Sequence, residues 1–181
     1  MKNKFLLLGA VIAVLFVSSS ALLAQKKTND SSQQTVSLQN LDGTTLSAGN
    51  LKGRVTVLAI GATWLPLSRQ QVLIVNQLQQ NYGKRDVAIY FVSTDASDAK
   101  SKNYADNAHL KSFAETNKMS VAVLRDASGT TLRFANVDQI PAFVILNKNG
   151  EIAGVVTGLG TEEESVKNTI TQISSEIDKV L

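Results

Sequence analysis

The sequence predicts an α/β domain in which a central mixed sheet is flanked by helices. Two apolar runs of strand length, Val55–Ile60 and Val87–Ser93, contain several β-branched residues and indicate strands that are buried on both faces. Segments with the apolar spacing of helices follow these runs, which is typical of an α/β sheet. The turn residues Asn147–Gly150 then predict a hairpin, so the last two strands are expected to be antiparallel.

The first 24 residues have the pattern of a segment that directs a chain out of the cytoplasm. Lys2 and Lys4 precede the apolar run Phe5–Val17, and small residues follow it, as in a secretory signal peptide. Without cleavage, Phe5–Ala24 is free of charge and long enough to anchor the chain in a membrane. Residues 1–24 are therefore expected to be either a signal peptide or an N-terminal membrane anchor. Both alternatives predict a periplasmic, secreted or membrane-held domain.

The remainder of the chain is expected to be one domain at residues 35–181, joined by a flexible polar linker at residues 25–34. The whole chain has a formal net charge of +3, of which Lys2 and Lys4 supply two, leaving +1 (3 − 2) after residue 24. No stripe of lysine and arginine is present, so nucleic acid is not an expected partner. The oligomeric state is left open.

The order of elements follows from apolar spacing and turn residues. Further strands are predicted at Thr35–Leu38, Val121–Leu124, Ala142–Leu146 and Ile152–Val156. Helices are predicted at Leu67–Tyr82, His109–Met119 and Thr130–Asn136. The glycines and the Asp42-Gly43 pair within Asn40–Gly53 predict turns there rather than regular structure.

The last helix has the clearest pattern in the chain. Thr161 and Glu164 have the spacing of a capping box, in which each side chain bonds the backbone of the other residue. One helical face carries Val166, Ile170, Ile173, Ile177 and Val180.

The segment Asp95–Asn107 is polar and rich in lysine, and is expected to be a solvated loop or insertion. Its carboxylates, Asp95, Asp98 and Asp106, lack the alternating spacing and central glycine of a calcium loop. The single histidine, His109, falls on a predicted helix and is expected at the surface. Neither a metal nor a cofactor is therefore predicted.

Three separated motifs carry a family resemblance. Leu41–Ser47 is followed by Leu51–Gly53; Ala62-Thr63-Trp64 is followed by Pro66 and Arg69; and Ile140-Pro141 leads into Ala142–Gly150. Together they resemble the thioredoxin-like superfamily, of the redoxin or periplasmic thiol-disulfide oxidoreductase type. The resemblance extends over nearly all of residues 36–180 and implies the thioredoxin-like fold.

The resemblance also shows what this chain has lost, because both active-site cysteines are replaced, by Leu65 and Ser68. In the family, the first cysteine becomes a thiolate at a helix N-terminus and attacks a disulfide, and the second resolves the mixed disulfide. The chain contains no cysteine at all. The family's proton-transferring carboxylate is commonly found at the place of Ala59 or Gln71, and neither residue titrates. Thiol-disulfide exchange by this chain alone is excluded, and no catalytic residue is predicted.

What the resemblance leaves is a binding groove, expected at Trp64, Leu65, Pro66, Ile140 and Pro141. In the family, the residue before a cis-proline pairs its backbone with an extended peptide, and Ile140-Pro141 matches that loop. The competing interpretation is that these residues complete the packing at the end of the sheet.

Three functional hypotheses follow from the resemblance. The first is a redox-inactive module that binds an extracytoplasmic protein or peptide. The second is a component of a thiol-disulfide or antioxidant pathway that acts with thiols of a partner. The third is a structural scaffold held at the membrane. A hydrolytic role for Ser68 would need a base, and His109 is the only histidine available.

Overall fold

The computed structural model describes residues 36–181. The predicted signal or anchor at residues 1–24 and the predicted linker at residues 25–34 lie outside the described residues. Within residues 36–181, no helix has both the length and the apolar character needed to cross a membrane.

The sheet is built around β3 (Val55–Gly61), in which every residue is buried. Its side chains alternate between two apolar cores: Val57 and Ala59 belong to one, and Leu58 and Ile60 to the other. A strand with no polar face is stable only when both of its faces are covered. The prediction of a fully buried strand is confirmed here.

Six more strands complete a mixed sheet. They are β1 (Ser37–Asn40), β2 (Thr45–Ser47), β4 (Val87–Ser93), β5 (Ala122–Arg125), β6 (Ala142–Leu146) and β7 (Ile152–Thr157). The strand order across the sheet is β2-β1-β5-β4-β3-β6-β7. β4 is parallel to β3 and β5, whereas the pairs β3–β6, β6–β7, β1–β5 and β1–β2 are antiparallel.

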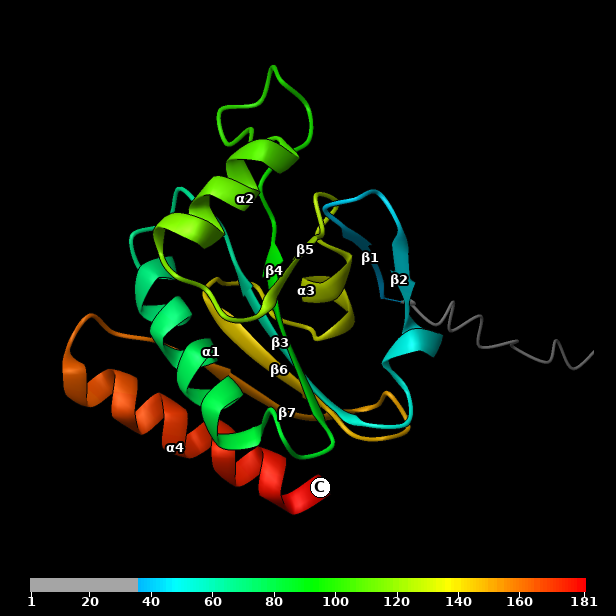
Figure 1. Ribbon diagram of the computed structural model, residues 1–181, viewed down its shortest axis with the longest axis vertical. Helices are drawn as coiled ribbons and strands as arrows, with labels where there is room; N and C mark the ends of the chain where they lie inside the picture. Colours follow the sequence, from blue (N-terminus) through cyan, green and yellow to red (C-terminus); the bar gives the residue numbers. More distant parts are fainter. Residues whose placement is uncertain (1–35) are drawn as a thin grey trace, which may run out of the picture. The chain divides into compact units, whose positions relative to one another are not determined.

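Helices cover both faces of this sheet (Figure 1). The helices on one face are α1 (Ser68–Tyr82), α2 (Asn107–Thr116) and α4 (Glu163–Val180). Leu78 of α1 and Ile173 of α4 enter the same core as Val57, and Leu110 of α2 packs with Phe91 beside it. The opposite face is covered by the 3-10 helix η1 (Ala48–Leu51) and α3 (Thr130–Phe134), and Leu51 of η1 shares this core with Leu38 of β1. The predicted fold, a central mixed sheet flanked by helices, is confirmed.

Most predicted elements agree with the structure to within three residues at each end. The exceptions are β2 and η1, which lie in a segment predicted to contain only turns. Thr45–Ser47 is three residues long, mostly exposed and paired only with β1 at the edge of the sheet. Such an edge strand is set by its partner rather than by an apolar pattern of its own.

The predicted capping box of the last helix is wrong. α4 begins at Glu163, its N-cap is Glu162, and no side chain caps it. The hydroxyl of Ser165 instead accepts a hydrogen bond from Gly160 N at 2.8 Å, which satisfies a donor just before the helix. Glu163 and Lys167 form an exposed ion pair along the first turns. The apolar face was predicted correctly, with Ile173 and Ile177 fully buried.

Two leucines of α1 provide a direct test of this packing. Leu78 is fully buried, whereas Leu73 is 60% exposed on the same helix. Leu78→Ala should lower the free energy of unfolding by about 2–5 kcal/mol, because it removes buried methyl groups and leaves a cavity. Leu73→Ala should change it by less than about 0.5 kcal/mol. Urea denaturation of both variants measures the difference, and equal losses would contradict the assigned helix face.

Candidate functional site

The candidate site is the turn that joins β3 to α1. The turn spans residues 62–67 and is closed by backbone hydrogen bonds from Leu65 N to Ala62 O at 3.2 Å and from Ser68 N to Leu65 O at 3.0 Å. Leu65 therefore lies just before the N-terminus of α1, where unpaired backbone N–H groups create a partial positive charge. Its side chain is half-buried.

An open depression of about 470 Å³ lies over this turn. Its lining residues are Thr63, Trp64, Leu65, Pro66, Arg69 and Gln70. Trp64 is 51% exposed, a large fraction for an aromatic ring that could otherwise pack in a core. Three of the five predicted groove residues, Trp64, Leu65 and Pro66, thus line one depression.

The other two predicted groove residues, Ile140 and Pro141, do not line this depression. The Ile140–Pro141 peptide bond is cis. Pro141 is buried directly before β6, and the half-buried Ile140 packs against the core that contains Leu58. The register of β3 and β6 pairs Ile60 with Ala142, so the two loops follow and precede neighbouring strands at the same end of the sheet.

Gln71 ties these two strand ends to α1. It is fully buried, and its Nε2 donates to Ile60 O at 3.0 Å and to Ala142 O at 3.3 Å. The first carbonyl belongs to β3 and the second to β6. One of the two positions at which the family commonly has its proton carrier thus holds a structural amide, which satisfies two buried carbonyls.

Ser68 is also structural rather than reactive. Its side chain is fully buried, and its Oγ accepts a hydrogen bond from Ala62 N at 3.3 Å. His109 is exposed on α2, and within residues 36–181 its imidazole forms no hydrogen bond; its backbone N donates to Asp106 Oδ1. A hydroxyl that is buried and engaged in the turn, with no histidine bonded to it, does not form a nucleophile–base pair.

A buried carboxylate behind the turn was not expected from the sequence. Asp95 was predicted to be solvated, but it is only 1% exposed. It accepts hydrogen bonds from Thr63 N at 2.9 Å, Thr63 Oγ1 at 2.7 Å and Ser93 Oγ at 2.7 Å. The prediction is wrong because three donors from folded neighbours replace water around the charge.

Asp98 and Asp106 follow the expectation of exposed loop residues. Asp106 Oδ1 caps α2 by accepting from His109 N at 2.7 Å, and Asp98 Oδ1 accepts from Lys100 N at 3.0 Å. Within residues 36–181, no group of three or more histidine, aspartate or glutamate side chains is placed to hold a metal ion.

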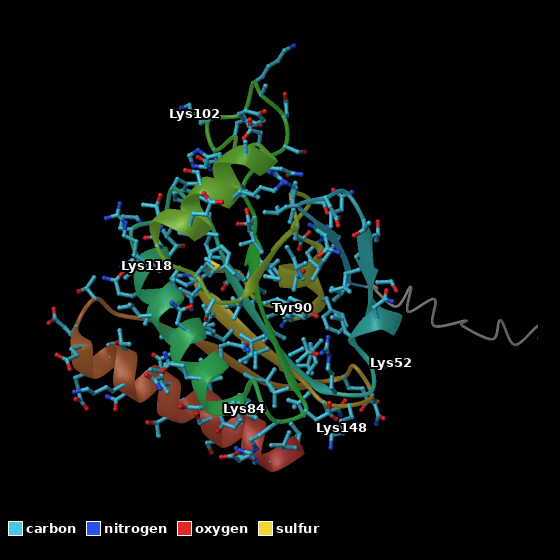
Figure 2. All side chains as sticks on the ribbon, viewed as in Figure 1. Lys52, Lys84, Tyr90, Lys102, Lys118 and Lys148 are labelled. Atoms are coloured by element: carbon cyan, nitrogen blue, oxygen red, sulfur yellow. The ribbon has the colours of Figure 1, made fainter. Side chains whose placement is uncertain are left out.

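Lysines lie at opposite ends of the domain, with Lys102 on the loop beyond β4 and Lys84 and Lys148 at the other end (Figure 2).

The carboxyl groups whose pKa is lowered by their surroundings lie outside the candidate site. A hydrogen bond from the backbone of Thr44 lowers the pKa of Asp42 in the β1–β2 turn. A hydrogen bond from Lys167 lowers the pKa of Glu163 at the start of α4. Both groups are exposed. The depression itself is lined by only one charged side chain, that of Arg69, so it has an aromatic and apolar character with a basic edge.

The fold and the turn define a class of protein, and comparisons with known proteins agree. Two solved structures are similar over most of the chain. A thioredoxin-like protein from Aeropyrum pernix has a TM-score of 0.63 at 19% identity, and the match covers 82% of this chain and 91% of that one. A secreted disulfide oxidoreductase of Mycobacterium tuberculosis has a TM-score of 0.57 at 19% identity, with 78% and 98% covered. The fold is thioredoxin-like.

Sequence comparison then shows the family. The redoxin family model matches residues 27–173, so the chain belongs to the redoxin family. The chain is 28% identical to the thioredoxin-like protein YneN of Bacillus subtilis over 71% of each chain. It is 24% identical to the thiol-disulfide oxidoreductase ResA of Geobacillus kaustophilus over 70% of this chain and 68% of that protein. The family model and these relatives confirm the family that the three motifs indicate. The absence of cysteine is consistent with redox inactivity.

The close packing at the end of β3 yields a second prediction. A Cβ atom at Gly61 would overlap Gln71 Oε1 and come within 3.0 Å of Ser68 Oγ and 3.2 Å of Phe91. Gly61→Ala should therefore lower the free energy of unfolding by about 1–3 kcal/mol through overpacking. Gly49→Ala is the control, because its Cβ would meet only Ser47 Oγ at an ordinary 3.6 Å. Thermal or urea unfolding measures both, and a neutral Gly61→Ala would show that Gln71 is not held in this position.

Proposed function

We propose that this protein is a redox-inactive member of the redoxin family that binds an extracytoplasmic protein or peptide. The contact region, called the recognition surface below, consists of Trp64, Leu65, Pro66, Ile140 and Pro141. The observation that carries the proposal is Trp64, which is 51% exposed at the edge of the depression although its neighbour Thr63 is hydrogen-bonded to the buried Asp95. Exposed aromatic anchors beside shallow depressions are common centres of binding energy in interfaces.

The backbone before β6 offers a second contact. Within residues 36–181, neither N–H nor C=O of Ile140 takes part in a hydrogen bond. An extended peptide could pair with these two groups as a short added strand, while its side chains pack against Trp64 and Leu65. Leu65 presents an apolar surface at the position of the family's attacking thiolate, so binding would be reversible and independent of redox conditions.

The exposure of Trp64 favours this proposal over the interpretation that these residues only complete the packing at the end of the sheet. Pro141 and Ser68 are buried and contribute to packing at the end of the sheet. Trp64 and Pro66 are exposed and add little to the core. The recognition surface therefore has a packed base and a free rim, which suits a binding site better than a purely structural element.

An extracytoplasmic location is part of the proposal. It is supported by the signal or anchor pattern of residues 1–24 and by the similarity to a protein described as secreted.

A role in a thiol-disulfide or antioxidant pathway, with thiols supplied by a partner, is the second candidate function. It is favoured by the relatives, several of which are thiol-disulfide oxidoreductases.

The proposal is tested by restoring the thiols. Leu65→Cys with Ser68→Cys in the full chain should gain insulin reductase activity with dithiothreitol as the electron source, because the helix N-terminus and the surrounding turn are retained. The unaltered chain should show no activity above background. Leu65→Cys alone should react with oxidised glutathione, releasing one reduced glutathione, and the mixed disulfide should persist because the buried Ser68 hydroxyl cannot resolve it. Ser68→Cys alone should react slowly with thiol reagents because that position is fully buried.

Activity in the double variant would support a retained binding module without its thiols. A folded but inactive double variant would mean that the recognition surface has diverged, and the scaffold hypothesis would then be preferred. Circular dichroism of each variant provides the control for folding.

Direct binding provides a further prediction. Extended peptides selected on the full chain from a phage-displayed library should bind less tightly by at least about tenfold to Ile140→Asp, because the new carboxylate is desolvated on binding. Reductant should have no effect on this affinity. Asp138→Asn, a change on the exposed part of the same loop, is the control. Unchanged affinity in Ile140→Asp would exclude Ile140 from the recognition surface, and sensitivity to reductant would favour the pathway role.

A further inference from the structure

The turn that carries Trp64 is attached to the neighbouring loop by a two-point contact. Thr63 N donates to Asp95 Oδ2 at 2.9 Å, and Thr63 Oγ1 donates to Asp95 Oδ1 at 2.7 Å. Both carboxylate oxygens are thus engaged by one residue, the direct neighbour of Trp64. A paired contact of this kind restricts rotation of the turn more than a single hydrogen bond would.

Asp95 is itself held in place from several directions. Ser93 Oγ donates to Asp95 Oδ2 at 2.7 Å, and Asp95 N donates to Ser93 Oγ at 3.2 Å. Arg125 Nη1 donates to Asp95 O at 3.3 Å, its Nη2 donates to Ala105 O, and its Nε donates to Asn107 Oδ1 at 3.1 Å. The guanidinium therefore joins both ends of the loop after β4. Among residues 36–181, no ion pair involves Asp95, and its charge is met by hydrogen-bond donors alone.

The strand register explains why this carboxylate reaches the turn. β3 and β4 are parallel, and Gly61 is paired with Ser93 at their carboxyl ends. Residues two positions beyond each strand, Thr63 and Asp95, therefore lie side by side. Thr94 N and Oγ1 both donate to Gly61 O, which closes the space between the two loops.

We infer that Asp95 is a positioning residue for the recognition surface: through Thr63 it holds Trp64 in the orientation that a partner binds. The consequence for binding rests on the proposed function, whereas the restraint on Trp64 does not. A surface that is already ordered loses less conformational entropy when a partner binds. If the turn lost its contact with Asp95, Trp64 would have the binding orientation in only a fraction of the molecules. The apparent affinity for a partner would then be the intrinsic affinity multiplied by that fraction.

A purely stabilising role for the carboxylate makes a different prediction. Thr63→Val and Ser93→Ala each remove one hydroxyl donor to Asp95, but only the first lies on the turn. If Asp95 only stabilises the fold, both variants should lose stability and neither should change Trp64. If Asp95 positions the turn, both should lose stability and only Thr63→Val should loosen Trp64.

Trp64 is the single tryptophan of the chain, so its fluorescence reports this turn alone. In the full chain without a partner, Thr63→Val should raise the amplitude of the fast component of time-resolved anisotropy about two-fold, because a charge-assisted hydrogen bond to the turn is lost. Ser93→Ala should leave it unchanged, and Thr63→Ser should restore the unaltered value because it retains a hydroxyl. Thr63→Ala replaces Thr63→Val if the latter does not fold.

An unchanged anisotropy in Thr63→Val, or an equal rise in Ser93→Ala, would overturn the inference. The second measurement places both substitutions in the Leu65→Cys/Ser68→Cys background. There Thr63→Val should lower insulin reduction about tenfold, whereas Ser93→Ala should leave it within about two-fold. If the double-cysteine chain is inactive while Thr63→Val still loosens Trp64, the proposed function fails and the positioning role of Asp95 stands.

Discussion

The burial of β3 on both faces is the constraint on which the rest of the structure depends. A register shift of one residue would exchange Val57 and Ala59 with Leu58 and Ile60 between two differently shaped cores, so the strand has one stable position. Its end at Gly61 therefore determines where the turn begins. α1 starts immediately afterwards, and Gln71 reaches back from its first turns to the ends of β3 and β6.

The replacement of both cysteines removes chemistry but keeps this frame. Ser68 retains a polar contact with the turn through Ala62 N, as a small buried side chain should at that position. Leu65 lies just before the N-terminus of α1, where the partial positive charge of the helix would stabilise a thiolate, but a leucine side chain has no group to ionise. The site therefore has the geometry of the redoxin family and the surface properties of a contact region, with an exposed aromatic ring, an apolar neighbour and a basic edge.

Buried polar groups organise the loops at the carboxyl ends of the parallel strands. Asp95 and Arg125 are both nearly inaccessible, and each is satisfied by hydrogen bonds to neighbouring backbone or side chains. In the loop after β5, the side chain of Asp126 accepts hydrogen bonds from the backbone N–H groups of Thr130 and Thr131, the first two residues of α3. Removing one partner from such a group leaves a buried charge unsatisfied, so these contacts hold the loops in one arrangement. The hydrogen bonds between Thr63 and Asp95 connect this group of loops to the Trp64 turn.

The amino-acid sequence alone was sufficient for most of the strands and helices in their order along the chain, for the family and for the loss of thiol chemistry. These conclusions depend on residue type and local periodicity: the apolar run of β3, the hairpin at Asn147–Gly150, the motif around Trp64 and the absence of cysteine. The tertiary structure alone decided that Asp95 is buried, that Gln71 bridges two strands and that Thr45–Ser47 pairs at the sheet edge. Each of these depends on partners distant in sequence. A hydrogen bond between Thr63 and Asp95 joins residues 32 positions apart, and no local pattern can predict it.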